Sequence, residues 1–347
     1  MSSRGFTLIE LMTSTAIMIV AITATCMMLI EAQRFTRNSE EAVNSNDNAR
    51  IAGEFIANAL RIAGMGGAAG LWINNSGTPR QISPIFGTDN ISTEGFTDDI
   101  WMILPDRRAF QDNNCVNNSG GAVSLAAGGT GPLKVTCTQG LLPAGGPTPA
   151  MLMVTNFGTS GVLVTQPTPT TPSDGTVVGV IGYSESALVG FPPRPFQLGD
   201  LVYAASAVHL FVHIDASGSA LYREVGVLSG GSPLSFVAGT VSRTVIQRNI
   251  EDLQFAFGTD PLNANLPDQY VYSNGFPDAV GSLVRVVRVT LVATHARSMR
   301  KGGDNSLLLA SQPMSIENHN VSAPVDSLRR SLYTRRVELP NLSEGSL

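Results

Sequence analysis

One uninterrupted apolar segment near the N-terminus constrains this chain more than any other feature. Residues 11–30 are twenty consecutive positions without a charged side chain. A helix of that length spans ~30 Å, which is the thickness of the hydrocarbon core of a bilayer. Hydroxyl side chains within the segment can bond back to helix carbonyls, and the residues concerned are Thr13, Ser14, Thr15, Thr23 and Thr25. The segment therefore predicts a membrane-spanning helix.

A secretory signal peptide is the alternative interpretation of the same segment. Such a peptide carries a small-residue cleavage site after its apolar stretch. Here the apolar run continues directly into Glu31 and Arg34 without an Ala-x-Ala site. The small residue that fits a cleavage site is Gly5, which lies before the apolar stretch. The span is therefore expected to stay in the mature chain.

Glu10 stands directly before the uncharged run. A carboxylate in lipid costs on the order of a few kcal/mol, so an acid at this place is a functional hypothesis that needs a partner. The partner that we expect is a free amine created at Phe6.

The string Arg-Gly-Phe-Thr-Leu-Ile-Glu from Arg4 to Glu10 resembles the class III signal of type IV pilins and type II secretion pseudopilins. The resemblance implies that a prepilin peptidase cuts after Gly5 and methylates Phe6, and that Glu10 is the family's assembly acid. It also implies a cytoplasmic leader and an inner-membrane protein with a periplasmic head, which becomes part of an extracellular pilus near its tip after assembly.

The helix is expected to continue past the membrane. Residues 31–63 contain no proline, and a glycine-rich stretch at 64–67 then stops the helix. An apolar stripe recurs at helical spacing at Ile51, Phe55, Ala59 and Ile62. We expect this stripe to pack on a head domain rather than to form a groove for a partner. The stretch 38–48 is rich in Asn and Ser, which leaves fraying or a kink open there.

The remainder of the chain is typical of a loop-rich β protein. Charged residues make up only 14%, and there are 35 glycines and 20 prolines. Strands are predicted at 99–104, 151–155, 162–165, 200–204, 207–214, 220–228, 283–294 and 333–339. The resulting fold class is α+β and pilin-like, with a long N-terminal helix packed on an antiparallel β-sheet head. Composition leaves open whether residues 117–193 are a flexible decoration or a folded β insertion.

The expected organisation has five parts: a leader peptide at 1–5, a transmembrane helix at 6–30, its periplasmic continuation at 31–64, a loop-rich β region at 65–198, and the antiparallel sheet of the head at 199–347. Segments 250–258, 284–292 and 332–341 resemble the PilW-like minor pilins, although Pro340 departs from that pattern. A J-type pseudopilin of type II secretion is the alternative within the same class.

Two cysteines lie in the polar part of the chain. Cys115 and Cys137 lack the closely spaced partner residues of a zinc site. If this part lies outside the cytoplasm, a disulfide between them is the natural expectation, and two unpaired thiols are the alternative.

Other clusters give little support for chemistry. His209 and His213 share one face of a predicted strand, which makes them polar sheet-face residues rather than metal ligands. Asp98, Asp99 and Asp112 can supply oxygen ligands but lack a calcium-loop pattern, so solvated loops are expected there. The pairs Arg285/Arg288 and Arg335/Arg336 are interpreted as strand-surface charges. The G-x-G-x-x-A string at 64–69 follows a helix and is not a dinucleotide site. We therefore predict no cofactor, no metal and no enzyme activity.

The predicted function is that of a structural subunit that initiates or caps assembly of a type IV pilus. Its expected partners are the prepilin peptidase, other minor pilins, the major pilin, the inner membrane and a tip adhesin. The net charge of −5 and the presence of only two lysines give no footprint of a nucleic-acid binder. An adhesin or DNA-capture role at the tip is the alternative from a different class. By family resemblance, the presence of Glu10 places the subunit below the tip-most one.

Overall fold

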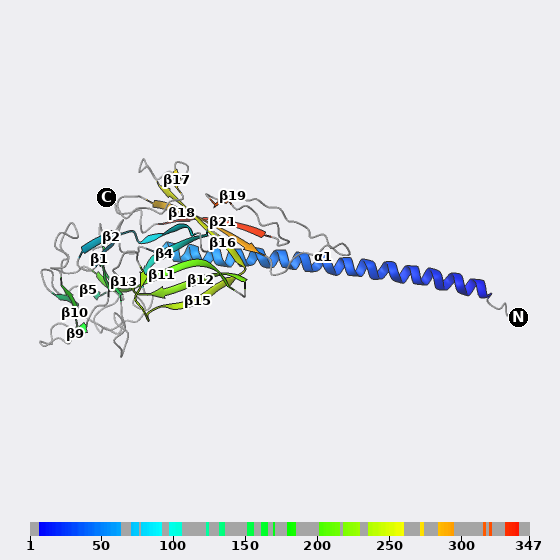
Figure 1. The fold of residues 1–347 in the computed structure, drawn as a ribbon, viewed down its shortest axis with the longest axis horizontal. Helices are drawn as coiled ribbons and strands as arrows, with labels where there is room; N and C mark the ends of the chain where they lie inside the picture. The colour runs from blue at the N-terminus through cyan, green and yellow to red at the C-terminus, as the bar shows by residue number, and fades with distance from the viewer. Residues whose placement is uncertain are drawn as a thin grey trace.

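The protein is a long helix whose C-terminal half lies in a β-rich head, while its N-terminal half projects away from the head (Figure 1). The computed structural model describes residues 7–63, 71–75, 78–91, 97–105, 123–124, 132–135, 151–155, 161–165, 169–170, 179–184, 201–215, 218–229, 235–259, 271–273, 284–294, 315–316, 319–320 and 330–339. Gly5, Phe6, Asp112, Cys115, Cys137 and the 64–69 glycine motif lie outside the described residues, so the predictions made for them stay predictions.

Helix α1 (Leu8–Ile62) runs for 55 residues. It begins at Thr7, whose backbone is extended and whose side chain caps the first turn, and it ends at Ala63. The observed helix agrees with the expected one to within two residues at each end. The Asn- and Ser-rich stretch at 38–48 is helical throughout, so the helix is not interrupted there.

Two large sheets make up the head. The ten-stranded sheet has the order β15-β12-β11-β7-β8-β1-β2, with β4 and β5 also pairing with β11 and with β3 pairing with β4. Its strands are β1 (Leu71–Asn75), β2 (Thr78–Ile82), β3 (Ile85–Ile91), β4 (Thr97–Pro105), β5 (Val123–Ser124), β7 (Met151–Thr155), β8 (Gly161–Thr165), β11 (Leu201–Asp215), β12 (Gly218–Gly226) and β15 (Ser242–Arg248). The four-stranded sheet has the order β17-β16-β18-β21. Its strands are β16 (Ile250–Thr259), β17 (Val271–Ser273), β18 (Val284–Thr294) and β21 (Arg330–Glu338).

Three small sheets complete the described strands. Their members are β6 (Pro132–Val135), β9 (Pro169–Thr170) and β10 (Gly179–Ser184), then β13 (Leu228–Ser229) with β14 (Ser235–Phe236), and β19 (Ser315–Ile316) with β20 (His319–Asn320). The described strand pairs are antiparallel apart from β1 with β8, which is parallel. The strands predicted at 151–155 and 162–165 are confirmed as β7 and β8, which pair antiparallel.

Strand β11 organises the larger sheet. The two strands predicted at 200–204 and 207–214 are one continuous strand of 15 residues. It pairs with β7 over residues 201–205, with β5 at residues 201–202, with β4 over residues 205–210 and with β12 over residues 207–215. Strands from both sides of the expected boundary at residue 199 therefore share one sheet.

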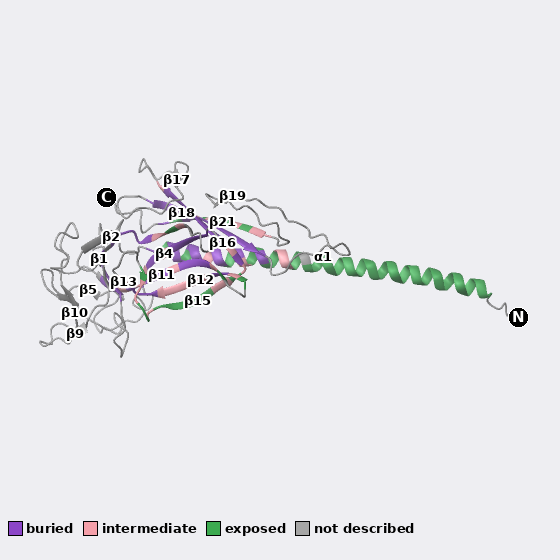
Figure 2. Ribbon diagram, viewed as in Figure 1, coloured by how far each residue is buried: buried purple, intermediate pink, exposed green. Residues whose placement is uncertain are grey.

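The main core lies where α1 meets both sheets. It contains Ile56 and Leu60 from the helix, Val208 and Leu210 from β11, and Phe255 from β16, all buried. Figure 2 shows the burial changing along α1, from exposed in the projecting half to buried within the head.

The buried face of α1 agrees with the predicted stripe only in part. Ala59 is buried and Phe55 packs against the core, whereas Ile51 is 54% exposed and Ile62 is only partly buried. The face that packs in the head contains mostly small residues, namely Ser45, Ala49, Ala52, Gly53, Ile56, Ala57, Ala59, Leu60 and Ala63. A Cβ atom at Gly53 would lie 2.2 Å from the Tyr333 ring of β21. Close approach of the helix to the sheet, rather than side-chain bulk, therefore decides which face is buried.

Candidate functional site

The projecting half of α1 is an unshielded apolar rod. Every residue from Thr7 to Arg37 is exposed, and Leu8, Ile17 and Val20 each expose more than two thirds of their surface. Among the described residues this is the one helix long and apolar enough to cross a membrane, and its most apolar 18-residue window is wholly unburied. An apolar surface of this size needs lipid or protein around it.

The hydroxyl groups in the span are satisfied within the helix itself. Thr13, Ser14, Thr15, Thr23 and Thr25 each donate to a backbone carbonyl three or four residues earlier, over 2.7 to 3.1 Å. The expected back-bonding is confirmed, and these side chains present no unpaired donor to the surroundings of the helix.

Glu10 takes part in a capping box with Thr7. The backbone N–H and the hydroxyl of Thr7 donate to Glu10 Oε2 over 3.0 and 2.9 Å, and the Glu10 N–H donates to Thr7 Oγ1 over 3.4 Å. Sequence reasoning missed Thr7, although the T-x-x-E spacing before an apolar run is the signature of this cap. Among the described residues, Glu10 Oε1 accepts no hydrogen bond. The carboxylate is thus held by its own helix and keeps one oxygen available to a partner.

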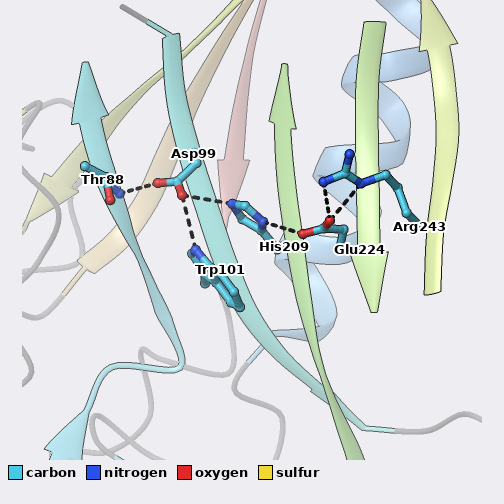
Figure 3. Close-up of polar contacts among 6 residues, drawn as sticks. All are labelled: Thr88, Asp99, Trp101, His209, Glu224 and Arg243. Atoms are coloured by element: carbon cyan, nitrogen blue, oxygen red, sulfur yellow. Dashed lines mark hydrogen bonds and ion pairs between the residues drawn. The ribbon is translucent and has the colours of Figure 1, made fainter. Parts of the chain in front are cut away.

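A polar network lies on the face of the larger sheet opposite α1. His209 of β11 bridges two acids: its Nε2 lies 2.8 Å from Asp99 Oδ2 of β4, and its Nδ1 lies 3.1 Å from Glu224 Oε2 of β12 (Figure 3). Asp99 also accepts from Trp101 Nε1 and from the Thr88 backbone N–H. Carboxylate oxygens only accept hydrogen bonds, so both contacts of His209 are satisfied when both ring nitrogens carry a proton.

Stacked rings accompany this network. The His209 ring lies between Trp101 and Phe211, with centroids 4.2 and 4.6 Å away, and Phe211 stacks on Tyr222 at 5.8 Å. Arg243 covers the Phe211 ring at 5.2 Å. His209 and His213 lie on one face of β11, as predicted. The described residues contain no group of three His, Cys, Asp or Glu side chains that could hold a metal ion. Because the ring faces are occupied by one another, this array braces the sheet.

Glu224 is the ionisable group most affected by the network. Burial raises its pKa, but hydrogen bonds and charges from His209 and Arg243 outweigh that effect and lower the pKa below its usual value. Arg243 Nη2 lies 2.6 Å from Glu224 Oε1. The carboxylate therefore stabilises the folded state in its ionised form.

Two predictions about surface charges were wrong. Asp98 and Asp99 do not lie in a solvated loop but are buried within β4, with 0% and 6% exposure. Arg285 is not a surface charge, since it is only 5% exposed. It lies on β18, which pairs with strands on both edges and is covered on both faces. Side chains on both faces of β18 are therefore mostly buried. The other arginines of these pairs are partly or fully exposed: Arg335 pairs with Glu54 of α1, and Arg336 lies 3.8 Å from Glu338.

A family match covers the C-terminal part of this head. Residues 211–341 match the family model of PilW, the type IV pilus-assembly protein W. The chain is PilW-like. The matched region includes the segments 250–258, 284–292 and 332–341, so the resemblance noted for them is confirmed. No curated protein and no solved structure matches the chain significantly.

The PilW match over this part of the chain supports involvement in type IV pilus assembly. The matched residues run from the middle of β11 to the end of β21, and they include Tyr222, Glu224 and Arg243 of the braced sheet. Helix α1 lies outside the match. The apolar rod fits a membrane anchor for this PilW-like head.

Proposed function

We propose that this chain is a minor pilin: a structural subunit that helps to initiate or cap a type IV pilus. The observation that carries the proposal is the single helix α1, whose N-terminal half is an exposed apolar rod and whose C-terminal half is part of the core of a PilW-like head. Before assembly, lipid covers the rod. In the filament, the helices of neighbouring subunits cover it.

The N-terminal events follow from the same proposal. A prepilin peptidase removes residues 1–5 after Gly5 and methylates Phe6, while the head stands in the periplasm. Glu10 then lies four residues beyond the new N-terminus. The amine of Phe6 on a neighbouring subunit is the natural cation for the Glu10 oxygen that its own cap leaves unused. The partners are other minor pilins and the major pilin, with a tip adhesin beyond them.

Substitutions at Glu10 test the docking role. Glu10→Gln keeps an oxygen that can accept from Thr7 but removes the charge, whereas Glu10→Ala removes both. If the charge docks the subunit, both variants insert in the membrane, are cut after Gly5 and lose piliation to nearly the level of a deletion strain. Insertion itself becomes easier, because a charge in lipid is costly. Piliation, co-purification with sibling pilins and the mass of the mature N-terminus are the measurements.

The control is Glu40→Ala, which removes an exposed acid from the same helix outside the span. It should leave piliation unchanged. Normal piliation and normal co-purification in Glu10→Gln would refute the docking role, and a mature chain that begins at Met1 would refute the pilin assignment itself. A defect in protein secretion with intact pili would instead favour the type II secretion pseudopilin.

A further inference from the structure

Strand β12 places a cation on its helix-facing side. Leu221 and Val225 of this strand belong to or pack on the main core, and Arg223 lies between them with the same orientation. Tyr222 stacks on Phe211 on the opposite, ring-bearing face, and Glu224 points to that face as well (Figure 3). A charged side chain among apolar neighbours is costly unless a counter-ion or hydrogen-bond acceptors accompany it.

The space that Arg223 faces is a cavity of about 450 Å³ between the last turns of α1 and the larger sheet. Its apolar lining residues come from the helix, β4 and β11, and they are Phe55, Ala59, Ile62, Leu104, Pro105 and Val208. Asn58 and Ser206 add polar groups to the lining. A volume of this size lies within the range of roughly 300 to 1,000 Å³ that is usual for ligand sites.

The described lining of this cavity offers no anion to the guanidinium. Arg223 Cζ lies 5.8 Å from the centroid of the Phe55 ring, which holds the cation over an aromatic face. Burial lowers the pKa of Arg223. Among the described residues, no carboxylate lines the cavity, and none forms an ion pair or hydrogen bond with this guanidinium. The acids next to Phe55 and Arg223 in sequence have other partners, since Glu54 pairs with Arg335 and Glu224 with His209 and Arg243.

We propose that this cavity receives the carboxylate of an acidic side chain from the head of a neighbouring pilus subunit. Arg223 binds the carboxylate, and the apolar walls pack against the stem of the side chain and its neighbours. An arginine fork matches a carboxylate in geometry as well as in charge. The amide of Asn58 and the hydroxyl of Ser206 are further donors within the same lining. This inference rests on the proposed pilin function, because it takes the partner to be a pilus subunit.

Position along the helix excludes lipid as the source of the anion. The apolar run ends at Ile30, and the cavity begins at Phe55. These 25 intervening steps of helix place the cavity roughly 37 Å beyond the end of the span. A lipid phosphate at the membrane surface cannot reach it, whereas the head of an adjacent subunit can.

The first test uses the full chain co-expressed with sibling minor pilins and the major pilin. Arg223→Gln should reduce co-purification of the sibling head by about tenfold, and Arg223→Lys, which keeps the charge without the fork, should lie between. Arg336→Gln is the matched control, because it removes an arginine charge from the exposed face of β21 and should have no effect. The proposal would be overturned if the sibling head co-purified equally well with Arg223→Gln and with Arg336→Gln.

Thermal unfolding of the same variants shows whether the counter-ion of Arg223 comes from a partner subunit or from the chain itself. If the counter-ion comes from a partner, Arg223→Gln removes an uncompensated cation and loses the contact with the Phe55 ring, so the midpoint of the isolated chain falls by no more than about 5 °C. A larger drop would mean that the arginine is paired within its own chain, which contradicts the proposal.

A direct probe needs no pilus. The full chain in detergent is titrated with acetyl-Leu-Glu-amide and with the neutral acetyl-Leu-Gln-amide. The glutamate peptide should bind at least about tenfold more tightly, and that preference should vanish in Arg223→Gln. Equal binding of the two peptides would overturn this inference and leave the proposed function standing. A mature chain without Phe6 at its start would instead overturn the proposed function, whatever the peptides do.

Discussion

At the scale of single residues, neighbouring acids of β4 have separate structural roles. Consecutive side chains of a strand point to opposite faces, so Asp98 and Asp99 face different parts of the head. Asp98 accepts a hydrogen bond from the Phe255 backbone N–H over 2.8 Å, which ties β4 to β16 and hence one large sheet to the other. Asp99 faces the ring-bearing side and holds His209 and Trp101.

Asp98→Ala should lower the free energy of unfolding by about 1–3 kcal/mol, because it leaves the buried Phe255 N–H without its acceptor. Asp98→Asn keeps an oxygen that can accept this hydrogen bond, so it should lower the free energy of unfolding by less. Urea unfolding of the full chain in detergent measures both. Glu338→Ala, an exposed acid at the end of β21, is the control and should change stability by less than about 0.5 kcal/mol. A loss of stability in Asp98→Ala as small as that in the control would contradict the stabilising role of the hydrogen bond between Asp98 and Phe255.

Glu224 makes stability depend on pH in the acidic range. Its pKa is lowered in the folded state from an ordinary value of 4.5, so its contribution is fully present above the unfolded pKa and is lost as pH falls through the folded pKa. Glu224→Gln should therefore lower the free energy of unfolding at pH 7. The difference in this free energy between the variant and the unsubstituted chain should become smaller below about pH 4.5. Urea unfolding of both chains at pH 7, 4.5 and 3 measures this difference. A difference that is the same at all three pH values would refute the prediction.

At the scale of elements, α1 and β21 are held together by close approach and charge. The small residues of the buried helix face let β21 lie near the helix backbone, and Gly53 sits directly under the Tyr333 ring. Arg335 of β21 pairs with Glu54 of α1 one residue further along. The two contacts join β21 to adjacent residues of α1. Together they fix the orientation of the helix about its own axis within the head.

Gly53→Ala should destabilise the head by about 1–3 kcal/mol, because the new Cβ overlaps the Tyr333 ring and overpacking costs about that much. The better helix propensity of alanine, worth up to about 1 kcal/mol, works in the opposite direction. The double variant Gly53→Ala with Tyr333→Ala should remove the clash, so the effects of the two substitutions should not add. Urea unfolding of the two single variants and the double variant forms the cycle. Additive effects would show that Gly53 and Tyr333 do not press on each other.

At the scale of the whole molecule, the chain combines two environments in one helix. The projecting half of α1 is exposed and apolar, and the head buries its core against the other half. A membrane anchor of this form is compatible with a head outside the cytoplasm, which is the compartment where disulfides persist.

Cys115 and Cys137 are expected to form a disulfide in that compartment. Both lie outside the described residues, and the prediction rests on their chain context. Closing a loop of this size contributes roughly 3 kcal/mol in the chain-entropy model. Peptide mapping without reduction, on protein expressed in the periplasm, should recover the linked pair. Cys26, an exposed thiol on α1, should remain unlinked and serves as the internal control. Two free thiols at 115 and 137 in such material would rule the disulfide out.

Local patterns in the sequence were enough to predict the helix, its approximate ends, the back-bonded hydroxyls of the span and most of the long strands. These features depend on hydrogen bonds and side-chain periodicity among residues close in the chain. The buried face of α1, the pairing of β4 with β11 a hundred residues later and the inward position of Arg223 were decided only in the tertiary structure. Each depends on which distant segment comes close: Ile51 is exposed because small residues elsewhere on the helix let β18 and β21 approach, and Asp98 is buried because β16 supplies its donor.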